Sequence, residues 1–231
     1  MRSLTLPVGT ALLAAALGCL TGSAYPDARL ASLHKDVDLT ATAHPGPTRL
    51  EVADVALDTL TIWRRASVKA DTSATSSATC RGCAGTAAAV QVLYIHQARR
   101  TRADNAAIAW SQCRSCEARS VSVQVVVIRR PTRLTANNRA LGTNVACLRC
   151  GSTAEAYQLV VIGADAKRLS PEALADLHAW ATDRATGRAN AADKQGRAQA
   201  LPTASAALEQ LVNRDLGTTT VLLDADASVP R

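Results

Sequence analysis

Three stretches of the chain alternate apolar residues with small or polar ones at a period of two, and each begins with a pair of cysteines. They read "CRGCAGTAAAVQVLYI" (80–95), "CRSCEARSVSVQVVVI" (113–128) and "CLRCGSTAEAYQLVVI" (147–162). A period of two is typical of a β-strand, because successive side chains of a strand point to opposite faces of the sheet. Both faces of each stretch are largely apolar, so we expect strands that are covered on both sides.

The three stretches are copies of an internal repeat of 33–34 residues. In each copy an isoleucine ends the run. Small-residue segments at 103–113 and 136–147 precede the second and third cysteine pairs. These segments could be strands or short helices. We favour strands, which would place each CxxC at the tip of a β-hairpin.

A glutamine stands eleven residues after the first cysteine of each copy: Gln91, Gln124 and Gln158. A buried amide without a hydrogen-bond partner is costly, so these side chains need partners. We expect a structural amide ladder, in which the glutamines bond to one another or to Asn105 and Asn138. A glutamine at a ligand site is the alternative.

Residues 1–24 have the features of a signal peptide. Arg2 precedes the apolar run "LPVGTALLAAALGCL" (6–20), and "GSA" (22–24) fits cleavage after Ala24. Lipidation at Cys19 or a retained N-terminus are the alternatives. The apolar run is too short and interrupted to favour a spanning helix. We therefore expect a secreted or cell-surface protein with no transmembrane helix after signal removal.

The rest of the chain divides into three regions. Residues 25–79 form an N-terminal segment that ends in a Ser/Thr/Ala linker, "ADTSATSSAT" (70–79). Residues 80–163 form the triple CxxC β-repeat domain, and residues 164–231 a helical segment with a disordered tail. The expected fold class is thus mainly β with a helical C-terminal segment, built from three β-hairpin repeats.

Two helices are predicted in that C-terminal segment. Ser170 is a suitable N-cap and Pro171 suits the first helical position of one helix. The stretch 205–217 predicts the second helix, which would end at Gly217.

Removal of the signal peptide would leave six cysteines in three pairs, for which three interpretations compete. The residues are Cys80, Cys83, Cys113, Cys116, Cys147 and Cys150. Disulfides, within or between pairs, are the preferred interpretation in an oxidising compartment, and no cofactor is then expected. Structural zinc held by CxxC knuckles is the alternative, although six cysteines do not divide into four-sulfur sites. A thiol–disulfide oxidoreductase is the third, weakened because each pair leads into a strand rather than a helix.

The positive charge is concentrated in the repeats. The chain has a net charge of +7, and residues 80–162 hold eleven arginines against three carboxylates. The arginines follow the strands, so we expect them to gather at one end of the sheet and those inside the CxxC pairs to gather at the other. The candidate binding residues are Arg99, Arg100, Arg102, Arg129, Arg130 and Arg133. Their expected partner is an anionic polymer, a lipid headgroup or a protein of the cell envelope. Nucleic acid is not expected, because aromatic residues for base stacking are scarce.

The region 80–162 resembles a cysteine-pair repeat of exported or membrane-associated bacterial proteins, and also the tail of some peptide zinc metalloproteases. The pattern "N-x-A…C-x-x-C…A-x-A-x-Q-x-V-V" carries this resemblance, and it is clearest at 105–127 and 138–161. The protease part requires an HExxH helix and membrane spans, neither of which this sequence contains. The resemblance therefore implies a non-catalytic binding or scaffolding module at the cell envelope, with no catalytic residue.

Overall fold

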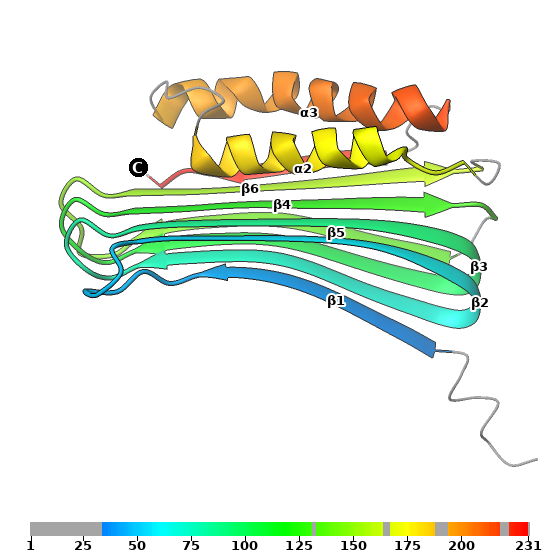
Figure 1. Ribbon diagram of the computed structural model, residues 1–231, viewed down its shortest axis with the longest axis horizontal. Helices are drawn as coiled ribbons and strands as arrows, with labels where there is room; N and C mark the ends of the chain where they lie inside the picture. Colours follow the sequence, from blue (N-terminus) through cyan, green and yellow to red (C-terminus); the bar gives the residue numbers. More distant parts are fainter. Residues whose placement is uncertain (1–33, 131–132, 164–166, 188–193, 218–221, 231) are drawn as a thin grey trace, which may run out of the picture.

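The computed structural model describes residues 34–130, 133–163, 167–187, 194–217 and 222–230. Its elements are, in chain order, β1 (His34–Ala43), β2 (Glu51–Ala78), β3 (Ala84–Ser111), β4 (Glu117–Ile128), β5 (Arg133–Asn144), β6 (Gly151–Ile162), α2 (Pro171–Thr186), α3 (Lys194–Leu216) and β7 (Leu222–Ser228). The expected class, mainly β with helices in the C-terminal segment, is confirmed (Figure 1). The predicted signal peptide lies outside the described residues.

The strands form a β-solenoid-like arrangement of stacked coils. β1 pairs with β2, β2 with β3, and β3 with both β4 and β5, always in parallel and with Cα partners 33 positions apart. β2 and β3 bend in the middle, where their pairing is interrupted at Trp63 and His96 and again at Ala66 and Arg99. Each of these long strands therefore contributes to two sheets that face each other.

We name the two sheets by what covers them. The covered sheet contains 51–62, 84–95, 117–128 and 151–162, and the open sheet contains 34–43, 67–78, 100–111 and 133–144. The helices α2 and α3 both lie on one side of the strands (Figure 1). They pack on the outer face of the covered sheet, where valines, Tyr94, Tyr157 and Leu159 meet leucines and alanines of the helices.

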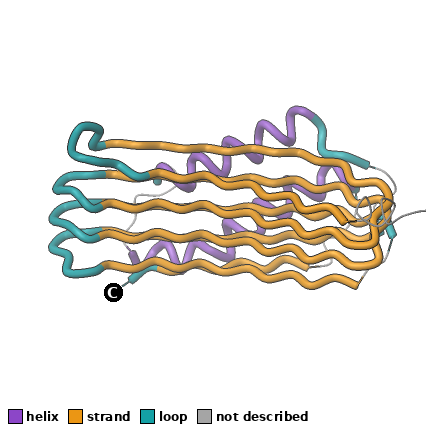
Figure 2. Tube along the Cα trace, turned by 90° about the horizontal axis from the view of Figure 1, so that it is seen from below, coloured by secondary structure: helices purple, strands orange, loops and turns teal. Residues whose placement is uncertain are grey.

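The prediction of β-hairpins is wrong, although the small-residue segments before the second and third cysteine pairs are strands as expected. The segments that flank each pair do not pair with each other. Each CxxC turn instead leads from the open sheet to the covered sheet, and the turns stack in a row at one end (Figure 2). The physical reason is the repeat itself, because parallel stacking at a regular offset places like side chains on like.

Residues 70–79, expected to be a linker, belong to β2 up to Ala78. Their alternate side chains Ala70, Thr72, Ala74 and Ser76 are buried between the sheets. A narrow interior admits only small side chains, so a buried strand here has the composition of a low-complexity segment. The regular coils thus begin before the first cysteine pair.

The tail also differs from the expected disorder, because it forms β7. This strand pairs antiparallel with β6. It also contacts β5: the Asn138 Nδ2 donates to the Asp224 carbonyl (3.0 Å), and the Ala140 amide donates to the Asp226 carboxylate (2.7 Å). β7 therefore covers the backbone groups of β6 that would otherwise form an open sheet edge at the last coil of the stack.

The helix α2 begins as its sequence predicts. The Ser170 Oγ accepts a hydrogen bond from the Ala173 amide (3.1 Å), and Pro171 occupies the first turn. Gly187 ends the helix with a φ of 74°, a left-handed conformation that glycine adopts without steric cost. The second helix is longer than expected, since α3 already begins at Lys194.

The space between the two sheets holds the glutamine side chains. Gln158 Nε2 donates to Gln124 Oε1 (2.7 Å), and Gln124 Nε2 donates to Gln91 Oε1 (3.0 Å). Gln91 also accepts from the Thr72 hydroxyl (2.8 Å). All three glutamines are fully buried. A parallel asparagine pair, Asn105 to Asn138 (2.8 Å), lies apart from this amide ladder.

A buried ion pair ties α2 to the covered sheet. Arg184 contacts Glu155 on β6 at 2.7 Å, and their side chains are only 9% and 5% exposed. The Tyr157 hydroxyl donates to the same carboxylate (2.8 Å). Burial, and then the charge of Glu155, raises the pKa of Tyr157 above its ordinary value.

Candidate functional site

The two ends of the coils carry different chemistry. At one end, the six repeat cysteines form three disulfides, each within its own CxxC pair: Cys80–Cys83, Cys113–Cys116 and Cys147–Cys150. No helix begins at these turns, which lead directly into β3, β4 and β6. The helix dipole that lowers the thiol pKa in catalytic dithiols is therefore not available here.

The third position of every CxxC turn has a left-handed backbone. The φ angles are 75° at Gly82, 55° at Ser115 and 58° at Arg149. Only the first of these is a glycine, so the other two turns hold a less favourable conformation. The tight turn returns the chain to the next sheet within a few residues, and the arginines inside the pairs are exposed there.

The opposite end is where the chain passes from the covered to the open sheet, and it is rich in arginine. The predicted binding residues Arg99, Arg100, Arg102, Arg129, Arg130 and Arg133 all lie at or just beyond this bend, and all are exposed. Arg100 and Arg133 are direct Cα partners on neighbouring strands. In-register like charges repel, so such a pair favours a bound anion.

One of the six differs from the rest. Arg102 donates to the Asp104 carboxylate at 2.7 Å, which neutralises it locally. Within the described part of the chain, the other five arginines make no ion pair. The candidate anion site therefore consists of Arg99, Arg100, Arg129, Arg130 and Arg133, which we call the arginine end.

The structure adds residues to the arginine end that the sequence analysis did not select. Trp63 stacks on His96 with ring centroids 4.0 Å apart and an interplanar angle of 9°. Trp63 is 62% exposed. The two rings line a shallow hollow of about 170 Å³ together with Arg64, Gln97, Arg129 and Arg130. The sequence does contain a signal for this pair. Trp63 precedes His96 by the same 33 positions that separate the earlier coils.

Two further cations approach from the segment before α2. Lys167 and Arg168 line a small cleft with His96 and Arg129. The Arg168 guanidinium lies over the Tyr94 ring, 5.4 Å from its centroid. Burial lowers the pKa of His96, and the positive charges of Arg129 and Arg168 lower it further. The positive potential that disfavours protonation of His96 would attract an anion to the same place.

Comparison of the chain with protein-family models, with curated proteins and with solved structures found no match. The resemblance to cysteine-pair repeats of envelope proteins therefore stays a prediction. Among the described helices, neither α2 nor α3 combines the length and apolar character needed to span a bilayer.

Proposed function

We propose that this protein is an exported, non-catalytic binding module of the bacterial cell envelope, and that its arginine end binds an anionic polymer or lipid headgroup. The observation that carries the proposal is that exposed arginines on consecutive coils gather at one end, and that none of the five pairs with a carboxylate of the described residues. Their spacing along the solenoid axis follows the strand separation, about 4.8 Å. A ligand with regularly repeated phosphates or carboxylates can contact several coils at once.

The guanidinium groups are well suited to bind phosphate and carboxylate groups. Arginine presents a planar fork of donors, which pairs with two oxygens of one anionic group. The exposed Trp63 ring, stacked on the half-buried His96 ring, adds a flat surface beside these donors, so a sugar or other ring of the polymer has a face on which to pack. The coils act as a rigid scaffold that fixes the spacing of these groups.

The test uses the oxidised full chain with two probes, inorganic polyphosphate and vesicles containing phosphatidylglycerol. One variant carries Arg100→Gln, Arg130→Gln and Arg133→Gln. The matched control carries Arg81→Gln, Arg114→Gln and Arg149→Gln, which removes the same charge from the cysteine turns. Binding to polyphosphate is followed by intrinsic tryptophan fluorescence, to which Trp63, Trp110 and Trp180 contribute, and binding to vesicles by cosedimentation.

We expect the arginine-end variant to bind at least about tenfold more weakly, a loss of roughly 1.4 kcal/mol, and the control to change less than about twofold. Equal weakening by both variants would show attraction to net charge alone, and no weakening by either would show another binding surface. Either result contradicts the proposal.

A further inference from the structure

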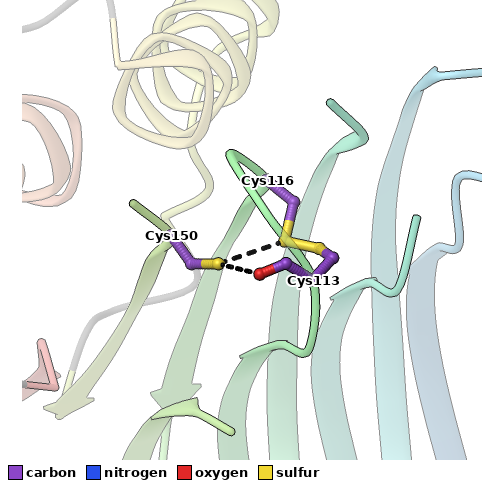
Figure 3. Close-up of side chains that lie close together, drawn as sticks. All are labelled: Cys113, Cys116 and Cys150. Carbon is purple, nitrogen blue, oxygen red and sulfur yellow. Dashed lines mark hydrogen bonds between the residues drawn. A yellow bond between two sulfur atoms is a disulfide. The ribbon is translucent and has the colours of Figure 1, made fainter. Parts of the chain in front are cut away.

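The second and third cysteine turns bring their sulfurs into one compact group. The sulfurs of Cys113, Cys116 and Cys150 all lie within 4.8 Å of one another (Figure 3). The Cys116 and Cys150 sulfurs, from neighbouring coils, are 3.4 Å apart. Cys147 joins this group through its bond to Cys150. Cys80 and Cys83 lie outside it.

The separation between sulfurs of the two coils is close to that in a four-sulfur metal centre. Zinc binds cysteine sulfur at about 2.3 Å in a tetrahedron, which places the sulfurs about 3.8 Å from one another. The separation of 3.4 Å between the two coils and the upper limit of 4.8 Å lie on either side of this value. Two stacked CxxC turns thus bring three sulfurs together, and Cys147, the bonding partner of Cys150, is the natural fourth ligand.

Two features of the surroundings favour thiolate ligands. The Cys113 amide lies 3.5 Å from the Cys147 sulfur and can donate to it. Four thiolates around a divalent zinc leave a net charge of −2, and the exposed Arg114 and Arg149 in the same turns offset it. Two side chains must rotate. The Cys150 sulfur lies 2.9 Å from the Cys113 carbonyl oxygen and the Cys113 sulfur lies 3.1 Å from the Ala78 carbonyl oxygen, positions that suit thiol donors rather than thiolates.

We propose that the reduced protein binds one zinc ion through Cys113, Cys116, Cys147 and Cys150. A phosphine or dithiol reductant supplies four electrons to the two disulfides, and four protons from the solvent complete four thiols. Zinc then displaces those four protons as the thiolates coordinate it. The site is independent of the arginine end. It also explains how six cysteines divide, because the first pair takes no part.

The stacking of the turns supports the choice of the second and third pairs. Arg114 and Leu148 pair as a parallel bridge, and the Ser115 amide donates to the Leu148 carbonyl (2.9 Å). These two turns are offset by 34 positions, whereas the earlier coils are offset by 33. The additional residue is accommodated near Ala146, where φ is 46°. The change of register therefore occurs between the two turns whose sulfurs lie close together.

The test compares oxidised protein with protein reduced anaerobically by a phosphine, which is then removed. Zinc alone is titrated in competition with a chromogenic chelator, and cobalt is used as a spectroscopic substitute. The variant Cys113→Ser/Cys150→Ser is compared with the matched control Cys80→Ser/Cys83→Ser, and circular dichroism confirms that both are folded.

We expect one zinc per chain in the reduced protein and in the control, and none in the oxidised protein. Zinc affinity of the Cys113→Ser/Cys150→Ser variant should fall more than about 100-fold, beyond the loss caused by changing residues that only orient the ligands. The cobalt form of the unmodified chain should show thiolate-to-metal charge-transfer absorption, a readout that needs no variant. Absence of this band, zinc binding by the oxidised protein, or equal loss in the control would overturn the proposal.

Discussion

The covered and open sheets share their coils but differ in what lies on their outer faces. The covered sheet packs its valines and Tyr157 against α2 and α3. The open sheet instead presents rows of charged and hydroxylated residues around a shallow hollow, including Asp71 and Lys69. One repeat unit therefore produces both a core layer and a solvent face. We therefore expect substitutions under the helices to destabilise the fold more than substitutions on the solvent face of the open sheet.

The largest difference between the two sheets is expected when one arginine is replaced at each of them. Among the described residues, Arg184→Met should leave Tyr157 as the one partner of the buried Glu155 carboxylate, and lower the free energy of unfolding by about 3–5 kcal/mol. Arg102→Met removes an ion pair whose arginine is 60% exposed, and should cost less than about 1 kcal/mol. Urea unfolding of both variants measures the contrast. Recovery by Glu155→Gln in the Arg184→Met background is the accompanying check.

A second contrast uses leucines. Leu159 is fully buried under the helices, whereas Leu141 on the open sheet is 56% exposed. Leu159→Ala should lower the free energy of unfolding by about 2–5 kcal/mol because it leaves a cavity. Leu141→Ala should change it by no more than about 0.5 kcal/mol. Thermal unfolding of the two variants would contradict the comparison if their losses were similar.

The smallest expected difference concerns the glutamines between the sheets. Gln124→Met removes the middle rung of the amide ladder, but Gln91 keeps the Thr72 hydroxyl and Gln158 keeps the Ala103 carbonyl. We therefore expect a loss of about 1–3 kcal/mol rather than unfolding. The same substitution at the exposed Gln97 should be within about 0.5 kcal/mol of the unmodified protein. Chemical denaturation distinguishes these outcomes, and equal effects would assign the ladder no role in stability.

The sequence predicted the strands and the inward position of the glutamines because the alternation of Gln124 with its valine neighbours is strong and repeated. It also predicted that arginines gather at one end, since Arg99 and Arg129 follow equivalent strands. Parallel pairing could not be read from period two, because parallel and antiparallel strands share that period. The small polar composition of residues 70–78 wrongly indicated a linker, because the narrow interior requires small residues in this strand.

The candidate site was only partly predictable. Arg102 carries the same charge as its neighbours, and only the structure shows that Asp104 pairs with it. Trp63 lies outside the cysteine-marked copies, so its stacking on His96 depends on a register that begins earlier in the chain. The grouping of Cys113, Cys116 and Cys150 depends on which turns are neighbours in space. Spacing along the chain does not contain that information.

The regular offset between coils also has a consequence for how such a chain can change in length. An in-frame duplication of one whole coil, for example residues 84–116, extends each stacked row by one member and keeps glutamine beside glutamine. Duplications of other lengths place polar amides opposite apolar positions. The single additional residue near Ala146 is tolerated because it lies in a turn. Insertions and deletions that the fold tolerates are therefore expected to add or remove whole coils.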